Sequence, residues 1–178
     1  MNFIKKTAAV FLAFSMLSLF ACHSQKRDLT GVDDNSSQAA KFQNAEKLSF
    51  TTTDIDGNEV SLDSYGSAKV IMFNMWEPCC GPCRGELPDL QKLYEKYKSK
   101  GLMIVGVFSD EDGLRDVVED DGIEYPMIRS CAAFDSFQTG YVPTTFFTDG
   151  SGNVLSEEPY VGSKSYDEWE SVILSYLK

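Results

Sequence analysis

Two apolar runs on either side of a helical pattern constrain the fold of this 178-residue chain most strongly. Lys69–Met75 (KVIMFNM) and Leu102–Phe108 (LMIVGVF) are almost continuously apolar, which is typical of strands buried on both faces. Between them, from Cys80 to about Lys98, apolar residues recur at steps of three and four, as on one face of a helix. These residues are Leu87, Leu90, Leu93, Tyr94 and Tyr97. Strand, helix and strand with short links predict a βαβ unit with parallel strands and a right-handed crossover.

The segments around this unit predict an α/β domain with a mixed sheet. Residues 47–62 alternate apolar and polar side chains on both sides of Asp56-Gly57-Asn58, which indicates a β-hairpin. The later elements that we predict are an acidic helix over Glu111–Asp121, a short strand over Tyr125–Ile128, two strands around the turn Asp149–Gly152, and a closing helix over Ser165–Leu177.

The composition excludes one class of partner. The chain has 16 basic and 27 acidic residues, a formal net charge of -11. A nucleic-acid backbone is bound by a basic surface, so we expect no nucleic-acid partner. A hydrophobic content of 43% with 12% aromatic residues is that of a packed globular protein, and the length suits one domain.

The first residues predict export from the cytoplasm. Lys5 and Lys6 precede an apolar run of 13 residues, Ala8–Phe20, which fits the core of a signal peptide and is too short for a comfortable membrane span. The run ends in Leu19-Phe20-Ala21-Cys22, which resembles the lipobox of bacterial lipoproteins. That resemblance implies cleavage before Cys22 and a lipid on its sulfur, whereas ordinary cleavage would leave a free thiol.

We therefore divide the chain into three parts. Residues 1–21 are expected to be a lipoprotein signal peptide, residues 22–45 a lipid-anchored flexible tether, and residues 46–178 the folded domain. The tether segment is polar and without a sustained period, and such a chain spans on the order of 25 Å. The expected location is extracytoplasmic, at a bacterial membrane.

Three cysteines stand within five positions of the segment EPCCGPCR. Their spacing allows a C-x-x-C pair (Cys80 and Cys83), a C-x-x-x-C pair (Cys79 and Cys83), or a metal site. A structural zinc site needs four ligands. Besides the three clustered cysteines, the predicted domain offers only the distant Cys131, and the single histidine of the chain, His23, lies next to the expected lipidation site. We expect no bound metal and no cofactor.

Two other chemistries remain as alternatives. The Cys79–Cys83 spacing is similar to that of Sco-type copper chaperones, which also need a remote histidine. Peroxiredoxins have a threonine three residues before their reactive cysteine, where this chain has Glu77 or Trp76. A copper-binding module or a peroxidase is therefore the alternative to thiol–disulfide exchange.

The position of Cys80 suits thiol–disulfide exchange. It begins the predicted helix, where unpaired N–H groups and the helix dipole favour the thiolate over the thiol. A decrease of the thiol pKa from about 8.5 to about 7 corresponds to about 2 kcal/mol. Cys83 follows one turn later, close enough to attack a mixed disulfide on Cys80, and Gly81-Pro82 keeps the turn compact.

The segment NMWEPCCGPCRGELPDL resembles the active-site segment of the TlpA/ResA-like membrane-anchored disulfide reductases, and the resemblance covers residues 46–177. The residues in register are Asn74, Trp76, Cys80, Pro82, Cys83, Glu86 and Pro88. The resemblance implies a thioredoxin-like fold, with a central mixed β-sheet flanked by helices and an N-terminal β-hairpin extension. It also implies reduction of disulfides in exported proteins, with a membrane electron donor of the DsbD/CcdA type.

The resemblance assigns roles residue by residue. Cys80 is expected to be the attacking thiolate and Cys83 the resolving thiol. Glu86 matches a carboxylate beneath the active site that relays protons. Pro143 matches a cis-proline beside the dithiol. The positions expected to meet the substrate are Trp76, Gly81, Pro82, Val142 and Pro143.

Cys79 departs from the family pattern, which has tryptophan at this position. Once Cys22 is lipidated, four thiols remain, which is an even number in an oxidising compartment. We expect Cys80–Cys83 to be the redox disulfide, with a Cys79–Cys131 link as a possible second one. Two spare thiols, or a Cys79–Cys83 disulfide, are the other options.

Overall fold

The structure is a computed structural model that describes Phe42 and residues 47–178. The expected signal peptide, the lipidation site Cys22 and nearly all of the expected tether lie outside the described residues. No helix within the described part is long and apolar enough to cross a membrane.

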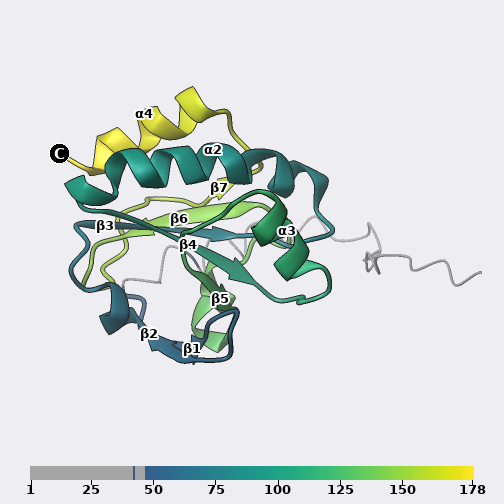
Figure 1. Cartoon of the computed structure of the whole chain (residues 1–178). Helices are drawn as coiled ribbons and strands as arrows, with labels where there is room; N and C mark the ends of the chain where they lie inside the picture. Colours follow the sequence, from purple (N-terminus) through teal and green to yellow (C-terminus); the bar gives the residue numbers. More distant parts are fainter. Residues whose placement is uncertain (1–41, 43–46) are drawn as a thin grey trace, which may run out of the picture.

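A five-stranded mixed sheet forms the centre of the domain, in the order β5-β4-β3-β6-β7 (Figure 1). Its strands are β3 (Val70–Met75), β4 (Leu102–Phe108), β5 (Met127–Arg129), β6 (Thr144–Thr148) and β7 (Tyr160–Val161). β4 runs parallel to both β3 and β5, whereas β6 runs antiparallel to β3 and β7. The predicted βαβ unit and mixed sheet are confirmed.

Helices cover one face of this sheet. α2 (Gly81–Tyr97) and α4 (Tyr166–Tyr176) lie side by side over it, with α3 (Leu114–Asp120) near the first turns of α2 (Figure 1). The apolar positions predicted for the helix over 80–98 face the sheet, because Leu87, Leu90 and Leu93 are buried. The core between these layers includes the large side chains of Trp76 and Trp169.

Smaller elements cover the other face. The predicted hairpin is present as β1 (Thr51–Thr53) and β2 (Glu59–Ser61), paired antiparallel below the sheet in Figure 1. With it lie two short 3₁₀ helices that contribute buried residues, η1 (Leu62–Tyr65) and η3 (Ala132–Phe137). A third, η2 (Lys98–Lys100), directly follows α2. Together they enclose a second core.

Aromatic rings dominate this second core. The Phe137 ring stacks on Phe146 with centroids 4.0 Å apart, and Phe73 stacks on the same ring at 5.2 Å. Phe42 packs edge-on against Phe137 and is buried. The packed domain therefore includes a residue that we expected in the tether.

Two predicted elements begin later than the sequence pattern indicated. The strand expected over Tyr125–Ile128 starts at Met127, because Pro126 has no N–H for the sheet and Tyr125 turns into the core. The helix expected over Glu111–Asp121 starts at Leu114, directly after Gly113, whose φ of 71° is left-handed.

The two strands expected around the turn at residues 149–152 are also only partly present. β6 precedes the turn, but the chain after it makes a single isolated bridge to β6, between Val154 and Thr148, before it leaves the sheet. It rejoins as β7, which pairs with the beginning of β6 at Thr144 and Thr145.

Gly106 in β4 permits close packing beside Trp76. A Cβ atom at this position would overlap the Met127 sulfur and lie 3.0 Å from Trp76 Nε1. We expect Gly106→Ala to lower the free energy of unfolding by about 1–3 kcal/mol, because the surroundings must shift to admit it. Urea unfolding followed by circular dichroism measures the change.

Gly85→Ala is the matched control for this substitution. Gly85 lies in α2, and a Cβ there would meet no atom within 4 Å. Alanine in a helix is more stable than glycine by about 1 kcal/mol, so this variant is expected to gain stability. Equal effects of the two substitutions would contradict the packing argument.

Candidate active site

The paired cysteines lie where β3 passes into α2. β3 ends at Met75, and Cys80 is the N-cap residue of α2 in an extended conformation. Cys80 and Cys83 form a disulfide with their Cα atoms 5.3 Å apart. The structure thus joins the C-x-x-C pair, and the alternative Cys79–Cys83 disulfide is not formed in it.

The helix start supplies donors to the Cys80 sulfur. The Cys83 backbone N–H donates to Cys80 Sγ at 3.2 Å, and the Cys80 carbonyl accepts from the Arg84 N–H at 3.1 Å. Pro82 stands in the first turn of α2, where backbone N–H groups have no partner within the helix, so its missing N–H costs no hydrogen bond. An N–H directed at sulfur favours the thiolate once the disulfide is reduced.

The two sulfurs differ in access. Cys83 is fully buried, with 0% of its surface exposed, whereas Cys80 is partly exposed. A large substrate can therefore reach Cys80 but not Cys83. Gly81 and Pro82 are exposed beside Cys80, as expected for residues at the rim of the site.

The Val142–Pro143 peptide bond is cis, as the resemblance implied. Thr144 pairs with Met75 across the β3–β6 register, which brings the loop before β6 next to the loop before α2. The Val142 carbonyl oxygen lies 3.7 Å from Cys80 Sγ. Pro143 is buried, while Val142 and Tyr141 are exposed, the latter by 73%.

Glu86 is buried within a set of neutral donors. Its Oε1 accepts from Asn74 Nδ2 at 2.9 Å, and its Oε2 accepts from Trp169 Nε1 at 2.9 Å and from the Lys164 backbone N–H at 3.1 Å. Burial raises the pKa of Glu86, and these hydrogen bonds oppose the shift. Glu86 follows Cys83 by three residues, so both lie on the inner face of α2.

Two of the predicted site residues do not lie on the surface that would contact the substrate. Trp76 is fully buried below the loop, so it supports the site from the core. Cys131 caps η3 as a free, half-buried thiol, and it packs against the aromatic second core. Because Cys131 is free, the Cys79–Cys131 link that we gave as one option for a second disulfide is not formed in this structure.

The sequence analysis missed the role of Glu77. Its carboxylate accepts from the Ser109 N–H at 3.2 and 3.3 Å and from the Asp110 N–H at 2.9 Å. These bonds tie the loop before Cys80 to the end of β4. Burial raises the pKa of Glu77, and the backbone N–H groups oppose the shift. The available signal was an acidic residue three positions before Cys80.

The raised pKa of Glu86 predicts a pH-dependent stability. A carboxyl whose pKa is above its usual 4.5 holds its proton more tightly in the folded state, so this contribution is lost as the pH rises through the raised pKa. Glutamine does not ionise, so Glu86→Gln does not undergo this decrease in stability as the pH rises. We expect the stability of the variant relative to the wild type to increase from about pH 4 to about pH 8.

Chemical unfolding across this pH range measures the difference. Glu119→Gln, at an exposed position of α3, is the control for the removal of one carboxylate. A pH dependence of Glu86→Gln no larger than that of Glu119→Gln would contradict the shift.

Comparison with known proteins agrees with this geometry. Residues 43–156 match the AhpC/TSA family. Thiol-disulfide oxidoreductase ResA of Bacillus anthracis is 29% identical over 137 residues, 75% of each chain. The ResA of Geobacillus kaustophilus is 33% identical over 109 residues, 59% of this chain and 62% of the relative.

A solved structure shares the fold. The crystal structure of a putative thiol:disulfide interchange protein DsbE from Chlorobium tepidum matches with a TM-score of 0.65 and 25% identity, covering 75% of this chain and 96% of that chain. With a thioredoxin-like fold and a disulfide between Cys80 and Cys83, this chain belongs to the AhpC/TSA family and has homologues among its thiol–disulfide oxidoreductases.

Proposed function

We propose that this protein reduces disulfides in exported proteins outside the cytoplasm. The observation that carries the proposal is the asymmetry of the Cys80–Cys83 pair, in which one sulfur is reachable and the other is buried. Disulfide exchange through a protein dithiol needs both: one thiolate to attack the substrate and a second, shielded one to release it.

The reaction proceeds in two exchanges. The reduced Cys80 thiolate attacks one sulfur of the substrate disulfide, so a Cys80–substrate bond forms and the other substrate sulfur leaves as a thiolate. The Cys83 thiolate then attacks Cys80 Sγ, which closes the Cys80–Cys83 disulfide and releases the second substrate thiolate. Two electrons pass to the substrate, and the protein dithiol is oxidised.

Glu86 acts as the proton acceptor for the second exchange. Cys83 must lose its proton before it attacks, and its buried position keeps bulk water away. A carboxylate with a raised pKa is a better proton acceptor than an ordinary one, because general-base strength follows pKa. Glu86 lies one turn further along the same helix face.

The Gly81-Pro82 dipeptide favours the reducing direction. It resembles the sequence between the cysteines of thioredoxin, whose potential is about -270 mV, compared with about -120 mV for strong oxidants. A reductase of this kind must receive electrons again after each cycle. A membrane donor of the DsbD/CcdA type is therefore its proposed partner.

A lipid on Cys22 is the proposed attachment to the membrane, on the resemblance of residues 19–22 to a lipobox. Cys22 lies outside the described residues.

Substitution of each cysteine tests the assigned roles in insulin reduction with dithiothreitol. Cys80→Ser is expected to abolish the acceleration by the protein. Cys83→Ser is expected to stop turnover and to accumulate a mixed disulfide on Cys80, identified by mass spectrometry. Cys131→Ser is the control and is expected to keep wild-type activity. Activity in Cys80→Ser, or trapping of substrate on Cys79, would contradict the assignment.

The redox midpoint tests the direction of the reaction. Equilibration with dithiothreitol buffers, followed by alkylation and mass spectrometry, is expected to give a Cys80–Cys83 midpoint between about -250 and about -300 mV. A midpoint of about -120 mV would instead indicate a protein that oxidises thiols to disulfides.

A further inference from the structure

We propose that a groove beside Cys80 binds a basic side chain of the substrate polypeptide, with the Glu77 carboxylate as the opposite charge. This inference rests on the proposed function and names the class of substrate that the site prefers.

The groove lies at the carboxyl edge of the sheet, where β3, β4 and β5 end and β6 begins. It has a volume of about 230 Å³. Its lining includes Trp76, Glu77, Ser109, Gln138, Tyr141 and Val142. Val142 joins the groove to the exchange centre, because its carbonyl oxygen is the one 3.7 Å from Cys80 Sγ. A residue next to the reacting cysteine of a substrate would therefore lie over the groove.

Glu77 supplies a fixed negative charge in this groove. Its three bonds to the backbone N–H groups of Ser109 and Asp110 hold the carboxylate in one place. Among the described residues, no lysine or arginine forms an ion pair with it. Burial and the neighbouring Asp110 both raise the pKa of Glu77, so the charge is costly without a partner. A cation in the groove would offset both effects.

The rest of the groove suits the stem of a long basic side chain. Tyr141 and Val142 present exposed apolar surface along it, and the buried Trp76 and Val107 lie beneath its floor. Lysine and arginine place their methylene groups on apolar surface and their charge at a polar end. An aromatic ring beside the path adds a cation–π contact. An acidic side chain in the groove would be repelled by Glu77.

The charge of the whole protein acts in the same direction. A formal charge of -11 attracts basic polypeptide segments over distance, and this attraction weakens as salt is added. The groove differs from this general field because it acts at one place beside Cys80. Its contribution is therefore measured as a difference between peptides that vary at one position only.

Matched disulfide peptides test the proposal on the full chain. The two residues on either side of the reacting cysteine are replaced in turn by arginine, glutamine or glutamate, and kcat/KM for reduction is measured. At one or more of these positions, arginine is expected to exceed glutamine by about fivefold, the upper end for one ion pair that is not fully buried. Glutamate is expected to be the poorest of the three.

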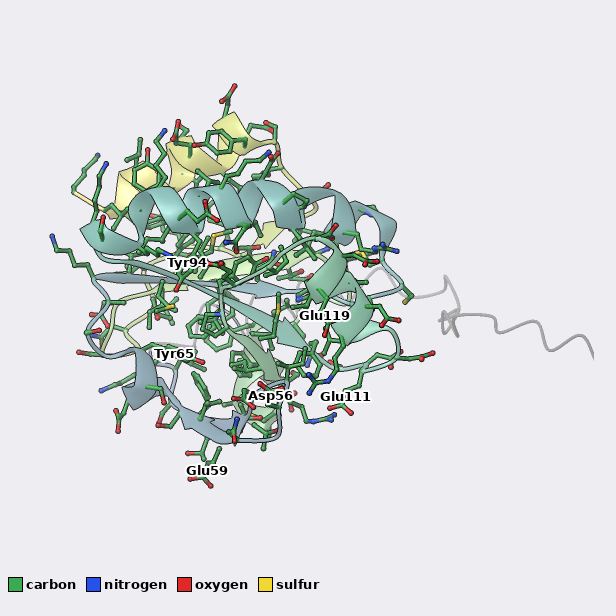
Figure 2. The ribbon with its side chains drawn as sticks, viewed as in Figure 1. Asp56, Glu59, Tyr65, Tyr94, Glu111 and Glu119 are labelled. Carbon is green, nitrogen blue, oxygen red and sulfur yellow. A yellow bond between two sulfur atoms is a disulfide. The ribbon has the colours of Figure 1, made fainter. Side chains whose placement is uncertain are left out.

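Two groove variants and one control identify the source of the preference. Glu77→Gln is expected to remove the arginine preference. If its weaker bonds to the end of β4 reduce activity in general, kcat/KM falls for all peptides alike, and the ratio of kcat/KM between arginine and glutamine peptides still reports the effect of the charge. Gln138→Lys adds a positive charge to the groove without touching those bonds, and is also expected to remove it. Glu119→Gln, labelled on α3 in Figure 2, removes a distant charge and is expected to retain it.

The outcomes separate this inference from the function on which it rests. If the wild type reduces arginine, glutamine and glutamate peptides equally at every position, the groove proposal is overturned while the reductase function stands. Preference that survives Glu77→Gln and Gln138→Lys, or is lost in Glu119→Gln, overturns the groove in favour of general charge attraction. If the wild type reduces none of the peptides, the proposed function itself fails.

Discussion

The antiparallel pairing of β6 with β3 is the constraint on which the active site depends. It places Thr144 opposite Met75, so that the loop before β6 and the loop after β3 meet at one edge of the sheet. All six residues of β3 are buried, and a slip of one residue would turn each of them to the wrong face. The buried strand therefore fixes the register that brings Val142 next to Cys80.

The same strand connects the dithiol to both acids near it. Asn74 in β3 donates to Glu86 beneath α2, while Glu77 lies just beyond the strand end and bonds to the neighbouring strand. Each carboxylate is held by neutral donors, and burial raises the pKa of each. On the proposed mechanism, Glu86 serves the hidden sulfur and Glu77 the side that the substrate approaches.

The elements that follow from local patterns were predictable. The strands around α2 are continuous apolar runs, and the Cys80–Cys83 spacing together with Pro143 carries the site through the family resemblance. The features missed depend on contacts between distant residues. Residues 132–137 form η3 because Phe134 and Phe137 fill the space beside Phe146, a packing that six residues without a period do not reveal. The free Cys131 thiol follows from the same packing, since that core holds its side chain.

The exposed edge of the site also departs from the family pattern in a consistent way. Cys79 stands where the TlpA/ResA-like sequences have tryptophan, so the aromatic ring before the nucleophile is absent. Tyr141, beside the cis-proline, is the most exposed large apolar side chain among the described residues. Tyr141 thus supplies exposed aromatic surface at this edge, and it lines the same groove as Glu77. Reactivity depends on the buried Cys83–Glu86 side, and recognition on the Tyr141–Glu77 side. Among the described residues, no hydrogen bond or ion pair joins Glu77 or Tyr141 to Cys83 or Glu86. Substrate preference can therefore change by substitution of edge side chains without breaking the contacts of the buried pair.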